Sequence, residues 1–141
     1  MKAVHPYLNF AGSTEEAFHF YQSIFGGEFT SLFRFDGMPG MQMPAEAQGK
    51  IMHISMDVSQ VTLMASDVLA DDATNLVVGN NISLYLDCES KAEAERLFAG
   101  LSAGGTVMMA LEDTFWGAYY GQLRDRFGIQ WMVNFSTAPS A

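Results

Sequence analysis

Histidine and hydroxyl side chains occur at alternating positions in two stretches of the N-terminal half. His5, Tyr7 and Asn9 alternate with apolar residues, and so do His53 and Ser55. Because successive side chains of a β-strand point to opposite faces, each set shares one face. A histidine in such a patch can act as an acid or a base near neutral pH. The pattern predicts a hydrogen-bonding patch for a ligand, with His53 as candidate catalytic base. The alternative is a set of ordinary polar groups in a partly wet cavity.

A second concentration of such residues runs through segment 115–135, FWGAYYGQLRDRFGIQWMVNF. It predicts two strands joined by the turn Asp125–Gly128, with Gly128 supplying a positive φ. Trp116 and Tyr119, together with Tyr120, are candidates to stack on a ligand or to fill the core. Alternation places Met132 on a cavity-lining face and Trp131 on a helix-covered one. Asp125 and Arg126 are expected to form a local ion pair, and an Arg that anchors an anionic ligand is the less favoured alternative.

Two helices are indicated by capping residues and apolar spacing. Ser13 and Glu16 have the spacing of a capping box, and Ser90 and Glu93 repeat it. Paired glycines at 26–27 and 104–105 end the helices. Strands are expected over 4–10, 28–35, 51–57, 60–66, 81–87 and 106–111. Pro6 favours either an edge position for the first strand or a place early in that strand.

The same order of elements therefore occurs twice. The helix stripes align at a separation of 77 residues (94 − 17), and the hairpins align at 68 (125 − 57). A longer loop at 36–49 in the first half accounts for the difference. The sequence predicts an α+β fold of two βαβββ modules with mostly antiparallel sheets in a single domain. Module 1 covers about 1–70, a linker about 71–79, and module 2 about 80–136.

Composition excludes several classes of function. Seven basic against sixteen acidic residues give a net charge of −9, so nucleic acid and anionic membranes are not expected partners. A lone cysteine, Cys88, cannot form an internal disulfide. No secretory leader or long apolar run is evident, and a cytoplasmic location is expected. The glycines form no dinucleotide-binding motif, P-loop or nucleophile elbow.

Several stretches resemble a known family: PYLNFAGSTEEAFHFYQSIFGGE, IMHISMDV, TLMASD and FWGAYYGQLRDRFGIQW. They are similar to the PhnB-like branch of the vicinal oxygen chelate superfamily, which includes glyoxalase I, extradiol dioxygenases and bleomycin resistance proteins. The resemblance implies a glyoxalase-like fold in which eight-stranded halves curl into facing concave sheets with helices outside. It also implies a small-molecule cavity and a homodimer.

The resemblance further implies four metal-ligand positions, which fall on His5, Met64, Asn81 and Met132. Only His5 is a good ligand for a divalent ion, because thioethers prefer soft metals. The expectation is therefore a small-molecule binding protein with no cofactor and no divalent metal site. The alternatives are a metal-dependent lyase or isomerase of glyoxalase type, and a metal-free enzyme with His53 as general base. Some proteins of this kind are labelled demethylubiquinone methyltransferases. We do not expect that activity, because no strand-to-glycine-loop-to-helix signature is present.

The loop at 36–49 is rich in methionine, glycine and proline. Its flexible Met38, Met41 and Met43 suggest a lid over the first cavity. A soft-metal site and a plain crossover loop are the alternatives.

Overall fold

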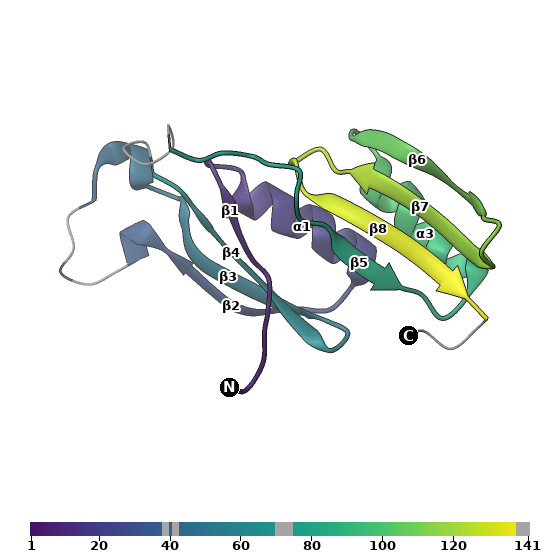
Figure 1. The fold of residues 1–141 in the computed structure, drawn as a ribbon. Coiled ribbons are helices and arrows are strands. Elements are labelled where there is room, and N and C mark those ends of the chain that lie inside the picture. Colours follow the sequence, from purple (N-terminus) through teal and green to yellow (C-terminus); the bar gives the residue numbers. More distant parts are fainter. Residues whose placement is uncertain (38–39, 41–42, 70–74, 138–141) are drawn as a thin grey trace. The chain divides into compact units, whose positions relative to one another are not determined.

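The computed structural model describes residues 1–37, 40, 43–69 and 75–137. The chain divides into two compact units, Met1–Val77 and Val78–Ala141. Within each unit four strands lie side by side and one long helix packs against them (Figure 1).

The first unit contains β1 (Tyr7–Phe10), α1 (Thr14–Phe25), β2 (Phe29–Arg34), β3 (Ile51–Val58) and β4 (Val61–Asp67). Two 3₁₀ turns, Phe35–Gly37 and Ala45–Ala47, lie between β2 and β3. The strand order is β1-β4-β3-β2, in which β1 is parallel to β4 and the other pairs are antiparallel. Strand β1 lies at an edge, which confirms the prediction made from Pro6.

The second unit repeats this plan with β5 (Leu84–Asp87), α3 (Lys91–Ser102), β6 (Thr106–Asp113), β7 (Ala118–Arg124) and β8 (Gln130–Ser136). Its strand order is β5-β8-β7-β6, again with one parallel pair, β5 and β8. The α+β fold of two βαβββ modules is therefore confirmed. The eight strands per half implied by the resemblance are wrong, because each described sheet has four.

The start of α1 differs from the predicted capping box. Ser13 precedes the helix, but its side chain makes no capping hydrogen bond. Instead the Thr14 amide donates to Asp67 Oδ1 (3.0 Å), and Asp67 Oδ2 accepts from the Ile51 amide (2.8 Å). A buried carboxylate from the end of β4 thus caps the helix and ties it to β3, and a carboxylate is favourable at the positive end of the helix dipole. A local sequence rule cannot detect this cap, because its residues are 53 positions apart.

The second helix begins as predicted. Ser90 Oγ accepts from the Glu93 amide (3.0 Å), and Glu93 Oε1 accepts from the Glu89 amide (2.9 Å). The Ser90 bond is the one predicted for a capping box, whereas the Glu93 carboxylate binds the amide of Glu89, one residue before the N-cap, and not that of Ser90.

One face of each sheet packs against its helix and forms the core. Helix α1 buries Ala17, Phe18, Tyr21 and Ile24, and α3 buries Ala94, Leu97 and Leu101. The stripes follow the predicted helical spacing. Phe18 is buried as well, because a wide apolar face of α1 includes positions between its main ridges.

Several boundaries also differ from the prediction. Strand β1 begins at Tyr7 rather than at residue 4, and β5 begins at Leu84 rather than at residue 81. Asn81 therefore lies before its strand. Met38 and Met41 of the predicted lid lie outside the described residues, as do Asp71 and Asp72 of the predicted linker.

Candidate functional site

Strand register separates the two faces of each sheet. In the first sheet Leu63, Ala65 and Ile54 are buried on the side of α1. We call the opposite side of each sheet, which its own helix does not cover, its open face. The open face of the first sheet carries Tyr7, Asn9, Ser31, Phe33, His53, Ser55, Thr62, Met64 and Ser66. The open face of the second sheet carries Tyr85, Asp87, Met109, Glu112, Tyr120, Gln122, Arg124, Gln130, Met132 and Asn134.

Three predicted site residues meet on the open face of the first sheet. The Tyr7 hydroxyl and His53 Nδ1 are joined by a hydrogen bond of 3.2 Å, and their ring centroids lie 5.7 Å apart. Tyr7 also pairs directly with Met64 across the parallel β1–β4 ladder. Tyr7 is 45% exposed, so the group is open to a ligand. Asn9, next on the same face of β1, is exposed.

Two other predicted residues are engaged by the protein itself. His5 Nδ1 accepts a hydrogen bond from the Thr62 amide (2.9 Å), which attaches the segment before β1 to β4. Ser55 is buried, and its hydroxyl lies 2.7 Å from Thr30 Oγ1 and 2.6 Å from Ser31 Oγ. Ser55 therefore belongs to a hydroxyl cluster between β2 and β3, and its hydrogen bonds are used there.

The second sheet presents a continuous row across all four strands. Tyr85, Met132, Gln122 and Met109 are register partners in sequence from β5 to β6. Tyr85 and Met132 form a parallel-strand pair of the same kind as Tyr7 and Met64. A tyrosine thus lies beside a methionine at the corresponding place in both open faces.

The next row of this face is polar. Asp87, Asn134, Tyr120 and Glu112 are register partners. Asn134 Nδ2 donates to Asp87 Oδ1 (3.2 Å), and Gln122 Nε2 donates to the Tyr120 hydroxyl (3.0 Å). Burial, reinforced by the nearby charge of Asp87, raises the pKa of Tyr85 above its ordinary value. The Tyr85 phenol therefore remains a neutral hydrogen-bond donor at physiological pH.

The three neighbouring aromatic residues divide between two sides. Trp116 is 55% exposed in the β6–β7 connection, and its ring lies edge-on to Tyr120 at 6.1 Å on the open side. Tyr119 lies on the helix side, where its hydroxyl donates to Glu95 Oε1 (3.1 Å) and Lys91 Nζ lies 4.5 Å from its ring centroid. Trp116 and Tyr120 therefore lie on the same side of the sheet as Met132, and Tyr119 lies on the opposite side.

The turn at Asp125 has a structural role. Asp125 is 3% exposed, and its Oδ1 accepts from the amides of Phe127 (2.8 Å) and Ile129 (3.1 Å). Its Oδ2 accepts from Trp131 Nε1 (2.9 Å). Arg126 Nε donates to the Ala103 carbonyl (3.2 Å), which ties the turn to the end of α3. Trp131 is buried on the helix side, as predicted.

The four positions implied for a metal do not form a fitting ligand set. Register places Tyr7, not His5, beside Met64, and Tyr85, not Asn81, beside Met132. Two thioethers, one amide and a histidine whose Nδ1 already accepts a hydrogen bond are poor donors for a hard or borderline divalent ion.

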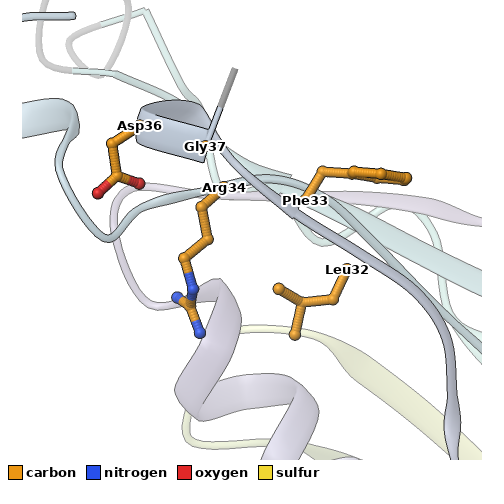
Figure 2. A pocket seen from close by; sticks show the side chains of 5 residues that line it. All are labelled: Leu32, Phe33, Arg34, Asp36 and Gly37. Carbon is orange, nitrogen blue, oxygen red and sulfur yellow. The ribbon is translucent and has the colours of Figure 1, made fainter. Parts of the chain in front are cut away.

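A cavity of about 460 Å³ lies at the end of β2, lined by Leu32, Phe33, Arg34, Asp36 and Gly37. Figure 2 shows Leu32 and Arg34 projecting to one side of β2 and Phe33 to the other. Arg34 is already paired with Glu15 through two bonds of 2.9 and 2.6 Å. Because the Arg34 cation is already paired with a carboxylate, the open faces are the better candidates for a ligand. Asp36 and Gly37 begin the predicted lid loop, whose role stays a prediction.

Comparison with known families identifies the chain. Residues 2–134 match the family model described as 3-demethylubiquinone-9 3-methyltransferase. The chain belongs to this family. A solved structure described below carries both this family name and the name PhnB. The predicted resemblance to the PhnB-like branch is therefore confirmed.

Solved structures support the same assignment. Protein PA1353 from Pseudomonas aeruginosa is 40% identical with a TM-score of 0.81, covering 96% of this chain and 98% of its own. A PhnB protein from Bacillus cereus, titled a putative 3-demethylubiquinone-9 3-methyltransferase, is 25% identical with a TM-score of 0.73, covering 96% and 100%. A glyoxalase/bleomycin resistance protein/dioxygenase family enzyme from Burkholderia phytofirmans is 18% identical with a TM-score of 0.59, covering 92% and 95%. The last similarity shows that this chain has the glyoxalase-like fold.

Proposed function

We propose that this family member is a small-molecule binding protein whose ligand lies on the open face of a four-stranded sheet and needs no divalent metal. The observation that carries the proposal is the tyrosine–methionine pair repeated on both open faces, Tyr7–Met64 and Tyr85–Met132. An aromatic ring beside a flexible thioether offers apolar contact that adapts to ligand shape. The neighbouring amides and hydroxyls supply orienting hydrogen bonds.

The fold supports binding rather than methyl transfer from a nucleotide-type donor. Within the described residues, both sheets have the mixed order in which the first and last strands of a module are the parallel pair. A doubly wound parallel sheet with a glycine-rich loop at a helix N-terminus would be expected for a nucleotide site. Methyl transfer, which the family description names, is therefore not part of this proposal.

The experiment is a saturation-transfer NMR titration with two neutral or anionic two-ring probes, biphenyl-4-carboxamide and biphenyl-4-carboxylate. We expect at least one probe to bind with a dissociation constant below 1 mM. Tyr85→Ala and Met132→Ala should each weaken that binding at least about fivefold, because each removes apolar contact from the face. Tyr119→Ala, on the helix side of the same sheet, is the matched control and should leave it unchanged. Because the pair is repeated, Tyr7→Ala and Met64→Ala test the open face of the first sheet in the same way. Failure of both probes to bind, or binding that all four open-face variants retain, would overturn the proposal.

A second candidate is metal-free proton transfer by His53. The hydrogen bond between Tyr7 and His53 Nδ1 favours it, because that contact orients the ring and leaves Nε2 available to a ligand. Deuterium incorporation into 2-indanone from heavy water, followed by NMR, tests this candidate. Catalysis above the buffer rate that is lost in His53→Gln and reduced in Tyr7→Phe would support it, and a rate equal to that of buffer would reject it.

A homodimer and a cytoplasmic location remain parts of the proposal. The edge strands β1, β2, β5 and β6 offer unpaired backbone groups that a second copy would cover. Light scattering at micromolar concentration should give twice the chain mass of 15.5 kDa, and a monomer mass would contradict the dimer. Among the described residues, no helix is both long and apolar enough to cross a membrane.

A further inference from the structure

The last residue of β7, Arg124, has a buried donor without a partner. Within the described part of the chain, its Nε is covered from solvent and makes no hydrogen bond. Burying a polar group without a partner is unfavourable. The other arginine of this hairpin, Arg126, donates its Nε to the Ala103 carbonyl. Arg124 thus differs from its near neighbour in keeping an unused donor.

Register places Arg124 on the open face of the second sheet. It pairs with Gln130 of β8 and Thr106 of β6, both neutral. The carboxylates of the same face, Asp87 and Glu112, lie in the row of Tyr120, four residues along β7. At a rise of about 3.3 Å per residue, that separation is about 13 Å. The face therefore has a basic end and an acidic end, with Tyr85, Met132, Gln122 and Met109 between them.

We propose that this face recognises an amphipathic aromatic ligand whose acidic group, a carboxylate or a similar anion, pairs with the Arg124 guanidinium. The inference rests on the proposed function and specifies the chemistry of its ligand. A guanidinium binds a carboxylate side-on through Nε–H and one terminal N–H. The residue as a whole is half-buried, and the inference requires its terminal torsions to turn so that this edge meets the ligand.

The side chains in the rows beyond Arg124 determine the shape and polarity of the rest of the ligand. One or two rings would lie over Met132 and Met109, beside Tyr85. Along β7 the backbone of Tyr120, whose ring neighbours Trp116, lies about 13 Å from that of Arg124. An anion of matching length is favoured at the basic end, because the acidic residues at the other end repel it.

Calorimetric titration with biphenyl-4-carboxylate and its uncharged counterpart, biphenyl-4-carboxamide, tests the inference. We expect the wild-type chain to bind the carboxylate at least about tenfold more tightly than the amide, which corresponds to one charge-assisted contact. Arg124→Met should abolish that preference and leave amide binding unchanged. Its melting temperature should equal or exceed that of the wild type, because the substitution removes an unpartnered buried donor. Arg126→Met is the matched control and should keep the preference.

The outcomes separate the two proposals. Equal binding of both probes, or a preference that persists in Arg124→Met, would overturn the Arg124 inference and leave the proposed function standing. Binding of neither probe by the wild type would overturn both. Loss of all binding together with a lowered melting temperature in Arg124→Met would show that Arg124 is structural, and would also overturn the inference.

Discussion

Replacing Asp125 by Ala should destabilise the chain strongly, although this residue lies in a turn. The substitution leaves three donors without their acceptor: the amides of Phe127 and Ile129 and the indole N–H of Trp131. An unsatisfied buried donor costs about 1–3 kcal/mol. Phe127 and Ile129 are half-buried, so water partly replaces their lost bonds. Taking about 1 kcal/mol for each amide and about 1–2 kcal/mol for the buried indole gives a loss of about 3–4 kcal/mol.

The assay is urea unfolding followed by tryptophan fluorescence. The chain has two tryptophans, so a Trp116→Phe background makes Trp131 the reporter. With a slope of about 2 kcal/mol per molar urea, the midpoint should fall by nearly 2 M. Asp125→Asn keeps one acceptor oxygen and should lie about halfway between.

Asp57 provides the matched control, because the sequence repeat aligns it with Asp125. It is exposed and accepts a single side-chain bond from Thr62 Oγ1 (2.9 Å). Asp57→Ala should therefore cost less than about 0.5 kcal/mol. A cost for Asp125→Ala that equals the cost for Asp57→Ala would refute the assignment of Asp125 as the anchor of the turn.

Three further predictions concern packing, acid and thiol reactivity. Gly121→Ala should cost about 1–3 kcal/mol in urea unfolding, because its Cβ would lie 2.7 Å from the Phe98 ring and 2.9 Å from Leu111 Cα; an unchanged midpoint would contradict this contact. The Arg34 guanidinium lowers the pKa of Glu15, so the pair stabilises the fold above the ordinary glutamate range and that contribution is lost as pH falls through the lowered pKa. The stability difference between wild type and Arg34→Met should therefore shrink in acid, and parallel pH profiles would argue against it. Burial raises the pKa of the Cys88 thiol to about 11, so its reaction with a disulfide reagent at pH 8 should proceed at the rate of unfolding, and rapid labelling of the folded chain would contradict the burial.

The fold was predictable wherever a short stretch of sequence determines the structure. The apolar stripes of α1 and α3, the Ser90 cap and the strand alternation around Trp131 all depend on residues within a few positions of one another. The cap of α1 was not predictable, because Asp67 replaces Ser13 through tertiary contact. The burial of Asp125 was likewise hidden, since it depends on the packing of the Trp131 indole against the turn.

The sequence predicted which strand face carries the candidate site, but not which residues of neighbouring strands lie beside one another on it. Alternation correctly placed Met132 and Trp131 on opposite faces of β8. The parallel registers that place Tyr7 beside Met64 and Tyr85 beside Met132, however, depend on where each strand begins. The family resemblance placed His5 and Asn81 at those positions, but β1 begins only at Tyr7 and β5 only at Leu84. The division between Tyr119 and Tyr120 could have been found by extending alternation back from the turn, since Leu123 pairs with the buried Trp131.

The most direct test of the central claim is methyl NMR of the methionines during titration with biphenyl-4-carboxylate. The chain has ten methionines, of which Met132 and Met109 lie on the open face of the second sheet, and Met56 is fully buried on the helix side of the first. The account predicts saturable shifts of the Met132 and Met109 methyl signals with Met56 unmoved. Saturable binding that leaves Met132 and Met109 unmoved would contradict a ligand site on this open face.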